Sequence, residues 1–598
     1  KANDGDDGTH WGNAPALASI DNPHWLQLTW DAPQTIQTVK IHWERCNATA
    51  YSLQTSDDGN SWSDLADFST APSDFRQTIE LDNAVTTRYL RISVTSFNPT
   101  APTESGGSIT YNTVGVCEFE TYSYAGILET QDVMTAEDVA NDLTVQPEIA
   151  SGGTFTMPSV PDGFEIRFLG ADYEQVLDSD LTVYQPLTDK DIKVNFTVQE
   201  VNDPDSAVDS KEYTVTVKGQ YTAQEGDNAK PAVIPELAEW KGAQGGDFTV
   251  ADGTRILLHP DVAAELAYMA EEFKADYEDI MGGTIEIATG SNPQAGDFYF
   301  MDSDGSKGLE ADGYYMDIDD YITIESEEAA GAYWSTRTIL QILTQTDGTI
   351  PKGETRDYPK YEVRGFMIDV ARRPFSWDIV DEIAKTMAWY KMNDLQLHLN
   401  DNYIPLENYT NRGDDPMTAY EGFRMESNVK EGGNNGLNQT NLTSEDLYYT
   451  KDDMRSFIQN YRKLGIDIVP EFDTPAHSLS FTKVRPDLRL GTSGRQNDHL
   501  NLTTDAAYNA SLEFVKSIWE EYLTGDNPVF DQDTIVNVGT DEYGDYNEQF
   551  RQYTDDLISY VQDTGRTVRL WGSLSMKSGN TEVSSDGVQM NIWNDSWA

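Results

Sequence analysis

The chain has few of the side chains that metal centres and redox chemistry require. Its 598 residues include two cysteines and seven histidines. Cys46 and Cys117 both lie in the N-terminal part of the chain, and this pair is compatible with one disulfide or with two buried thiols. Because the histidines are scattered along the sequence, no zinc site is predicted.

Basic residues are also scarce. Lysine and arginine number 41 against 102 aspartate and glutamate residues, which gives a formal net charge of −61. Nucleic acids and anionic membranes bind basic surfaces, so neither is predicted as a partner. The sequence has no run of about 18 apolar residues, so no membrane-spanning segment is predicted. Neutral polar partners remain, and 13 Trp with 31 Tyr suit sugar rings, whose apolar faces stack on aromatic side chains.

The length predicts several domains, each large enough to bury a core. Residues 1–124 read as all-β, with alternating strands such as Thr38–Trp43 and Tyr89–Val94. Residues 125–221 form a second small β unit whose alternation predicts an immunoglobulin-like β-sandwich spacer. After a polar linker, residues 232–357 mix strand and helix patterns, which we expect to form a structural α/β platform.

Residues 358–598 repeat a strand followed by a helix. The expected strands are 363–370, 394–399, 466–471, 535–538, 568–571 and 588–593, and the expected helices are 377–391, 451–464, 507–522 and 547–563. Repeated βα units predict a parallel sheet with right-handed crossovers, and a (β/α)8 TIM barrel is its natural closure. Only six strands are found, so we expect the last two βα units to lie beyond the sequence given, which makes this barrel incomplete at its C-terminus.

Polar residues follow the ends of several of these expected strands, where a buried strand has no packing reason to carry them. The runs are Asp369, His398-Leu-Asn-Asp401, Glu471-Phe-Asp473-Thr-Pro-Ala-His477 and Gly539-Thr-Asp541-Glu542. Because the carboxyl ends of parallel strands meet at one rim of a barrel, we expect these side chains to converge on an active site. A metal site made of His398, Asp401 and Asp473 is disfavoured, because their spacing fits no zinc or calcium motif.

The order of motifs in the N-terminal unit resembles the F5/8 type C, or discoidin, jelly roll, a fold shared with family 32 carbohydrate-binding modules. The motifs are Asp4-Gly5…Thr9-His10-Trp11, the strand from Trp25, the turn Ser56-Asp-Asp-Gly59…Trp62 and the strand from Arg88. The resemblance implies a structural Ca²⁺ ion with Asp4, Asp7, Thr9 and Glu118 as candidate ligands, and hard oxygen ligands suit that ion. The alternative is that these are ordinary turn carboxylates.

The strand-end motifs resemble glycoside hydrolase family 20, the β-N-acetylhexosaminidases and lacto-N-biosidases, over residues 230–598. The matching stretches are Arg364-Gly-Phe-Met-Ile-Asp369, His398-Leu-Asn-Asp401, Asp473-Thr-Pro-Ala-His477 and Gly539-Thr-Asp541-Glu542. The resemblance implies a retaining reaction in which the substrate's own 2-acetamido group attacks the anomeric carbon and no cofactor takes part in catalysis.

The same resemblance assigns roles to individual residues. Glu542 is expected to be the general acid and then the base, and Asp541 to orient the acetamido group. The expected sugar-binding residues are Arg364, Asp401, Trp571 and Trp593. Asp473 and His477 are expected to support Glu542. The alternatives are that Arg364 is an ion-pair partner, that His477 caps a helix and that Trp593 belongs to the core.

Two positions depart from the family pattern. Asn537 stands where the family usually has His, four residues before the catalytic Asp, and Gln396 begins a second-strand motif that often reads His-Trp-His-Leu-Thr-Asp. Both departures are expected to change the outer polar network and to leave the acid and its helper in place.

The resulting prediction is an exo-acting glycosidase that removes terminal β-linked N-acetylglucosamine, or another N-acetylhexosamine, from oligosaccharide or glycoprotein glycans. One alternative is a lacto-N-biosidase that releases a Gal-GlcNAc disaccharide, and another is a non-catalytic glycan-binding adhesin. Glycan substrates favour an extracellular or cell-surface location. The chain opens at Lys1 apparently inside a domain, so we expect any signal peptide or anchor to lie outside the sequence given.

Overall fold

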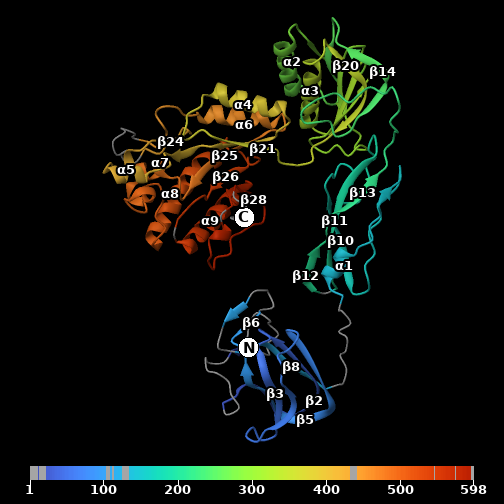
Figure 1. Ribbon diagram of the computed structural model, residues 1–598. Coiled ribbons are helices and arrows are strands. Elements are labelled where there is room, and N and C mark those ends of the chain that lie inside the picture. Colours follow the sequence, from blue (N-terminus) through green and yellow to red (C-terminus); the bar gives the residue numbers. More distant parts are fainter. Residues whose placement is uncertain are drawn as a thin grey trace. The chain divides into compact units, whose positions relative to one another are not determined.

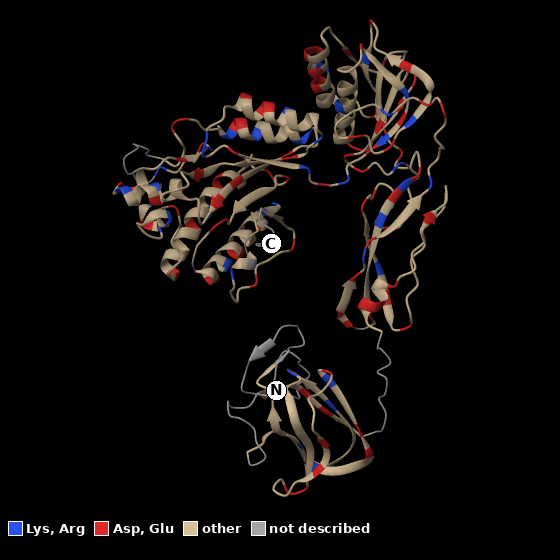
Figure 2. Cartoon of the chain, in the orientation of Figure 1, with Lys and Arg blue, Asp and Glu red and all other residues tan. Residues whose placement is uncertain are grey.

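The computed structural model describes residues 11–12, 22–102, 108–110, 114–123, 134–201, 203–430, 441–544, 546–572 and 574–593 (Figure 1). Contacts divide the chain into two compact units, Lys1–Thr135 and Ala136–Ala598. In the part of the chain that the structure describes, no helix has the length and apolar character needed to cross a membrane. Charged residues of both signs are distributed over both units, with Asp and Glu the more frequent (Figure 2).

The first unit is all-β in its described residues, in agreement with the prediction from strand alternation. Six of its strands form one antiparallel sheet in the order β1-β8-β2-β5-β3-β4, and two more form a small pair. The strands are β1 Trp11–Gly12, β2 His24–Trp43, β3 Ala48–Ser56, β4 Ser63–Phe68, β5 Arg76–Phe97, β6 Thr100–Pro102, β7 Ser108–Thr110 and β8 Gly115–Tyr122. Trp43, Leu53 and Phe119 are fully buried in its core. Cys46 and Cys117 are both thiols.

The second unit begins with a small sheet, in which β12 also pairs with β11 outside the main order β10-β11-β13-β9. Its elements are α1 Ala136–Asn141, β9 Glu148–Ile149, β10 Phe164–Ala171, β11 Lys190–Glu200, β12 Asp203–Asp209 and β13 Tyr213–Val217. Apolar and polar residues alternate along β11, and this pattern sets which face of the strand is buried. Ile192, Val194 and Phe196 are fully buried, while the residues between them are not.

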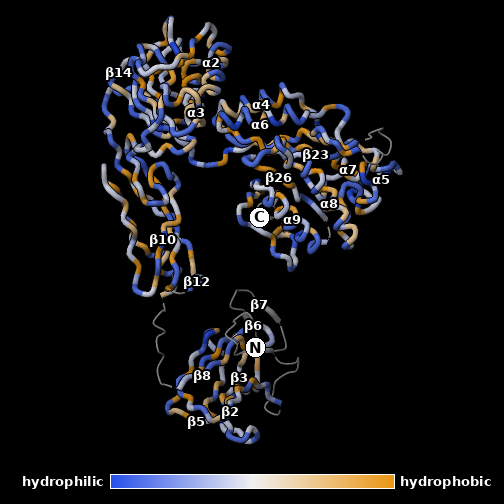
Figure 3. The backbone as a smooth tube through the Cα atoms, turned by 180° about the vertical axis from the view of Figure 1, so that it is seen from behind, coloured by the Kyte–Doolittle hydropathy of each residue, from blue (hydrophilic) through white to orange (hydrophobic). Residues whose placement is uncertain are grey.

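A seven-stranded mixed sheet follows, in the order β14-β20-β18-β19-β17-β15-β16. Its elements are β14 Lys241–Thr249, β15 Arg255–Leu258, α2 Ala267–Met281, β16 Glu286–Thr289, β17 Phe298–Asp302, β18 Tyr314–Ile318, β19 Ile322–Ser326, α3 Ala329–Leu343 and β20 Thr349–Asp357. Helices α2 and α3 pack together beside this sheet, and apolar segments gather between helix and sheet (Figures 1 and 3). Helix α3 is buried along almost its whole length, which fits the predicted structural platform.

The last part contains a six-stranded parallel sheet in the order β21-β22-β25-β26-β27-β28. Its strands are β21 Gly365–Asp369, β22 Asp394–His398, β25 Asp467–Thr474, β26 Val536–Gly539, β27 Val568–Trp571 and β28 Val588–Asn591. The main helices are α4 Trp377–Trp389, α6 Lys451–Arg462, α8 Asp505–Leu523 and α9 Asn547–Gln562. The repeated βα order predicted from sequence is therefore present, with most element ends displaced by one or two residues.

Several short elements lie in the connections at the carboxyl ends of these strands. They are β23 Asn400–Asn402, α5 Glu407–Arg412, η1 Pro416–Thr418, β24 Glu421–Phe423, α7 Leu479–Val484, η2 Pro486–Leu488, η3 Gly494–Asn497 and η4 Leu574–Met576, where η denotes a 3₁₀ helix. None of them was predicted, because each is too short to show a periodic pattern. These elements form the edge of the sheet at which the polar residues lie.

Candidate active site

The predicted polar residues meet because the parallel strands align their carboxyl ends. Asp369 at the end of β21 is in register with His398 at the end of β22, and His398 is in register with Glu471 of β25. Glu471 is in turn paired with Asn537 of β26. A row of polar side chains thus crosses the sheet at the level where the strands break into loops, as expected for this edge of a parallel barrel.

The chain turns sharply just before Asp541 and Glu542. Gly539, Thr540 and Glu542 have φ angles of 77°, 70° and 45°, so this turn uses left-handed backbone that residues other than glycine seldom adopt. At Gly539 a Cβ atom would lie 2.1 Å from Oδ1 of Asp473, so only glycine permits β26 to approach that side chain. Left-handed backbone at non-glycine residues concentrates at functional sites, where the surrounding structure holds it.

The two adjacent carboxylates occupy different environments. Asp541 Oδ1 accepts a hydrogen bond from the indole Nε1 of Trp593 at 3.1 Å, and burial raises the pKa of Asp541 although the charge of His477 opposes this. The side chain of Glu542 is 33% exposed, and the nearest basic atoms are Nε2 of His477 and Nη1 of Arg495, each 3.7 Å from its Oε2. Asp541 is therefore the enclosed carboxylate and Glu542 the accessible one.

His477 connects Glu542 to the buried acidic residues behind it. Its Nδ1 lies 3.1 Å from Oδ1 of Asp401, and its Nε2 lies 3.8 Å from Oδ2 of Asp473. Burial disfavours the charged imidazole, but the charges of Asp401 and Asp473 outweigh burial and raise the pKa of His477 to about 10. The predicted grouping of Asp473, His477 and Glu542 is thus present in space, and His477 does not act as the cap of helix α7, whose first flanking residue is Ser478.

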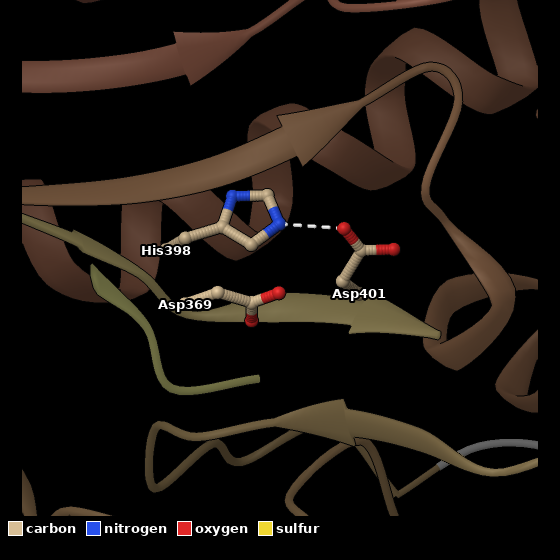
Figure 4. Close-up of side chains that lie close together, drawn as sticks. All are labelled: Asp369, His398 and Asp401. Carbon is tan, nitrogen blue, oxygen red and sulfur yellow. Dashed lines mark hydrogen bonds and ion pairs between the residues drawn. The ribbon is translucent and has the colours of Figure 1, made fainter. Parts of the chain in front are cut away.

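His398 lies at the centre of a second, fully buried part of the network (Figure 4). Its Nε2 lies 2.7 Å from Oδ2 of Asp401, and its Nδ1 lies 2.7 Å from Oε1 of Glu471. Burial lowers the pKa of His398, but the two carboxylates outweigh burial and the net effect is a large increase. The donor atoms of Asp369, His398 and Asp401 lie within 4.8 Å of one another, but both ring nitrogens of His398 already face carboxylates, so neither is left to bind a metal ion.

The structure does not bring Arg364 to this site, which corrects the prediction of a sugar-binding role. Arg364 precedes the first residue of β21, whereas the site follows the last, and five strand residues span roughly 16 Å. Its Nη2 lies 2.9 Å from Oδ2 of Asp312, and its Nε donates to the carbonyl oxygen of Lys391 at 2.7 Å. Arg364 is therefore the ion-pair partner that the alternative reading described.

Arg372 was not predicted as a site residue, but it follows the carboxyl end of β21 and lines the cavity that contains Glu542. Its Nη2 lies 2.7 Å from Oδ2 of Asp401, and its Nη1 lies 2.9 Å from Oδ2 of Asp369. Burial lowers the pKa of Arg372, but these two carboxylates outweigh burial and raise it. The signal in the sequence was its place directly after the strand, in Asp369-Val-Ala-Arg372, on the rim side of β21.

Asp401 is at the site but is not placed to contact a sugar, contrary to the expectation. Its side chain is 1% exposed, and both of its oxygens are engaged, Oδ2 by Arg372 and His398 and Oδ1 by His477 and the backbone N–H of Asn402. These partners lower the pKa of Asp401 in spite of its burial. Asp401 therefore positions its neighbours.

The two predicted tryptophans follow β27 and β28. Trp571 is the last residue of β27, and its Nε1 donates to Oε1 of the buried Glu471 at 2.7 Å. Trp593 stands two residues after β28 with 47% of its surface exposed, so it is not a core residue. Glu471 was expected among the converging strand-end residues but was assigned no role of its own, and its carboxylate contacts the side chains of His398, Trp571 and Gln396.

A cavity of about 230 Å³ opens beside Glu542. It is lined by Arg372, Asn402, Ile404, His477, Arg495, Asp498, His499 and Glu542. The candidate calcium ligands Asp4, Asp7 and Thr9 lie outside the described residues, while Glu118 is a buried residue of β8.

Comparisons with known proteins agree with this geometry. The family model for the glycosyl hydrolase family 20 catalytic domain matches residues 361–598, the model for domain 2 of that family matches residues 230–358, and the F5/8 type C domain model matches residues 1–109.

Two similar curated proteins are a lacto-N-biosidase and a β-hexosaminidase. The chain is 26% identical to the lacto-N-biosidase of Bifidobacterium bifidum over 392 residues, covering 60% of this chain and 30% of that protein. It is 24% identical to the β-hexosaminidase of Akkermansia muciniphila over 316 residues, covering 48% and 59%. The chain thus spans less than two thirds of the length of either relative.

Among solved structures, the family 20 β-N-acetylhexosaminidase of Streptomyces coelicolor is similar at 20% identity and a TM-score of 0.46, covering 61% of this chain and 71% of that one. The two family 20 models cover nearly all of residues 230–598, and the strand-end motifs that they match are the ones that meet in space. This chain belongs to glycosyl hydrolase family 20, with the domain 2 and catalytic domain of that family behind an F5/8 type C domain.

Proposed function

We propose that the protein hydrolyses terminal β-linked N-acetylglucosamine, or another N-acetylhexosamine, from glycans with retention of the anomeric configuration. In this proposal Glu542 transfers the proton, and the 2-acetamido group of the substrate is the nucleophile. The similarity to a β-hexosaminidase and a lacto-N-biosidase supports this class of substrate.

One observation carries the mechanism. Among the described carboxylates of the site, Asp401, Glu471 and Asp473 are each 1% exposed or less and Asp369 is paired with Arg372, which leaves Asp541 as the carboxylate beside Glu542 that a substrate can reach. A conventional retaining glycosidase needs a second accessible carboxylate about 5 Å across the bond from the acid to form a covalent intermediate. Asp541 directly precedes Glu542 in the chain and accepts a hydrogen bond from the indole of Trp593. This position suits a carboxylate that steadies the substrate's amide.

The reaction then proceeds in two steps. Glu542 gives its proton to the glycosidic oxygen while the carbonyl oxygen of the acetamido group forms a bond to the anomeric carbon, and the bond to the leaving oxygen breaks. Asp541 accepts a hydrogen bond from the acetamido N–H and offsets the positive charge of the resulting oxazolinium ion. Water next attacks the anomeric carbon from the face that the leaving group vacated, Glu542 takes its proton, and the amide is released.

The remaining residues bind and orient. Arg372 lines the cavity beside Glu542. Its ion pairs with Asp369 and Asp401 hold the planar guanidinium in position to bind sugar hydroxyls. Trp571 and Trp593 offer indole faces for the sugar ring and the acetamido methyl group. The charged His477 lies between Glu542 and the buried Asp401 and Asp473. Because His477 makes no direct hydrogen bond to Glu542, the carboxyl group of Glu542 can give up and regain its proton.

The test replaces each carboxylate in turn. Glu542→Gln should lower kcat on the nitrophenyl β-glycoside of N-acetylglucosamine by at least the roughly 10²–10⁴-fold typical of general acid catalysis. Asp541→Asn should also lose most activity, and azide should restore none of it, because no enzyme nucleophile has been removed. Azide rescue with an inverted glycosyl azide product would show a conventional two-carboxylate mechanism and overturn the proposal.

A second candidate is release of a Gal-GlcNAc disaccharide, which the similarity to the Bifidobacterium lacto-N-biosidase favours. The two activities share the chemistry and differ in the space beyond the terminal sugar. Parallel kinetics on the nitrophenyl glycosides of N-acetylglucosamine and of lacto-N-biose decide between them.

We further propose that the N-terminal domain binds glycans and raises the local substrate concentration, and that the protein works outside the cell or on its surface. A Ca²⁺ ion bound through Asp4, Asp7, Thr9 and Glu118 belongs to the same proposal. If the protein were instead a non-catalytic adhesin, Glu542→Gln would change neither turnover nor glycan binding. Enzyme turnover in the wild type that vanishes in this variant excludes that alternative.

A further inference from the structure

The cavity beside Glu542 contains a second arginine that the reaction as described does not use. Arg495 belongs to the 3₁₀ helix η3, and its side chain is 49% exposed. Its Nη1 lies 3.7 Å from Oε2 of Glu542, which is beyond hydrogen-bonding distance. In a chain with a net charge of −61, a cation placed at the carboxyl group that moves the proton requires an explanation.

The donors of Arg495 are largely uncommitted. Its Nε faces Oε1 of Glu407 at 3.3 Å, but no acceptor in hydrogen-bond geometry serves Nη1 or Nη2 among the residues that the structure describes. Arg372, the other arginine of the cavity, donates to Asp369 and to the carbonyl oxygen of Asn402. Arg495 therefore has more N–H groups to offer a ligand than Arg372 has.

The backbone that carries Arg495 is held firmly although its side chain is exposed. The N–H of Gly494 donates to Oγ1 of Thr410 at 3.1 Å, and the carbonyl oxygen of Asn497 accepts from Oγ1 of Thr482 at 2.6 Å. On the other side of the segment, His499 stacks on the ring of Tyr543, the residue after Glu542, with centroids 5.2 Å apart. The backbone that carries Arg495 is thus anchored beside the segment that carries the acid.

The position of Arg495 relates it to the leaving group. A general acid must lie beside the glycosidic oxygen, so the sugar that departs lies against the accessible side of Glu542. Glu542, Arg372 and Arg495 line the same cavity, whereas Asp541, Trp571 and Trp593 do not line it, so the cavity extends from the terminal sugar to the leaving-group side. On the same cavity, Ile404 is 54% exposed and offers an apolar surface to a sugar ring.

We propose that Arg495 binds the hydroxyl groups of the sugar on the leaving-group side of the scissile bond and so makes the enzyme selective for glycans over simple glycosides. This inference rests on the proposed glycosidase function. Because Glu407 faces Arg495, its charge is already offset, and the sugar that it binds is neutral rather than sulfated or sialylated. Arg495 is a specificity-determining residue and takes no part in proton transfer.

The experiment compares two substrates that share the same terminal sugar. N,N′-Diacetylchitobiose has a sugar as leaving group, and the nitrophenyl β-glycoside of N-acetylglucosamine does not. Arg495→Ala should lower kcat/KM for the disaccharide by about 10- to 100-fold, the effect of losing a hydrogen bond to a charged group, and leave the nitrophenyl value nearly unchanged. Arg412→Ala is the matched control, because Arg412 is 61% exposed, lies 3.6 Å from Asp414 and does not line the cavity.

Equal losses on both substrates would overturn the inference, because Arg495 would then act on the terminal sugar or on Glu542. No loss on either substrate would also overturn it. If the wild type cleaves neither substrate, the proposed function fails, and calorimetry then decides the inference separately. Disaccharide affinity should fall from Glu542→Gln to the Glu542→Gln/Arg495→Ala double variant while affinity for free N-acetylglucosamine stays the same, and equal disaccharide affinities would contradict it.

Discussion

Replacing Arg372 and Arg364 one at a time tests the assignment on which sequence and structure disagree. The two arginines stand at opposite ends of β21, and only Arg372 lines the cavity beside Glu542. We expect Arg372→Ala to destroy sugar binding at the carboxyl ends of the strands. We expect Arg364→Ala to weaken the packing of the parallel sheet against the preceding α/β domain.

The structure sets the size of both effects. A hydrogen bond from a charged group contributes about 1.5–3 kcal/mol, so loss of a guanidinium that contacts the sugar lowers kcat/KM by about 10- to 150-fold per contact. The free energy of unfolding should fall by only about 1–2 kcal/mol in Arg372→Ala, because the buried Asp401 keeps His398 and His477 as partners. Arg364→Ala removes an ion pair to Asp312 and donors to backbone carbonyl oxygens, which predicts a loss of about 2–4 kcal/mol with unchanged kcat/KM.

The assay pairs initial-rate kinetics on the nitrophenyl β-glycoside of N-acetylglucosamine with urea denaturation of the same preparations. Both variants are assayed well below their unfolding midpoints, so that stability and activity are separated. If Arg364→Ala lowered kcat/KM more than Arg372→Ala did, with the stability of Arg364→Ala unchanged, the sugar would lie at the other end of the strands.

Three further predictions concern other parts of the molecule. The pKa of His477 is raised from 6.5 to about 10, so its charge stabilises the fold fully below pH 6.5 and progressively less up to pH 10. The free energy of unfolding of the wild type should therefore exceed that of His477→Gln by roughly 5 kcal/mol at most at the low end of this window, and the difference should shrink as the pH rises. Denaturation at both ends of the window measures this difference. Trp593→Phe keeps an aromatic face but removes the indole donor to Asp541, and should lower kcat by about 10-fold with little change in KM for the nitrophenyl glycoside, whereas an unchanged kcat would separate Trp593 from catalysis. Chelation with EGTA should lower the melting temperature of the N-terminal domain in the wild type but not in Glu118→Gln, and equal melting curves with and without EGTA would argue against the calcium site.

The parallel sheet could be predicted because its strands leave a clear pattern. Runs such as Ile535–Val538 are mostly β-branched and apolar, and they alternate with helices of regular amphipathic spacing. The structure places the strands within a few residues of the prediction. The short rim elements, including α5 and η3, could not be found this way, since a helix of one or two turns carries no readable period.

The site was predictable in its outline and less so in its details. The turn after β26 and the grouping of Asp473 with His477 follow from where the strands end. The prediction for Arg364 was wrong because this residue, although part of a matching motif, lies at the amino end of β21. The rule that places active sites at the carboxyl ends of the strands favours Arg372.

The sequence predicted that these polar residues converge, but it could not show how they pair behind the acid. Asp401 and Glu471 are far apart in the chain, and only the register of β22 against β25 places His398 between their carboxylates. Burial and pairing then decide which of these residues can meet a substrate. Such competition between internal partners and ligand has no signature in the order of the residues.

The central claim is that the substrate's own amide attacks the anomeric carbon, and a series of modified substrates measures this most directly. Nitrophenyl β-glycosides whose N-acetyl group carries zero, one, two or three fluorine atoms differ mainly in the nucleophilicity of the amide oxygen. If the amide attacks, kcat/KM falls steeply with each added fluorine in the wild type, while Asp541→Asn, in which the substrate's amide is poorly held, shows a lower and flatter series. Rates that do not respond to fluorination in the wild type would show that the amide is not the nucleophile.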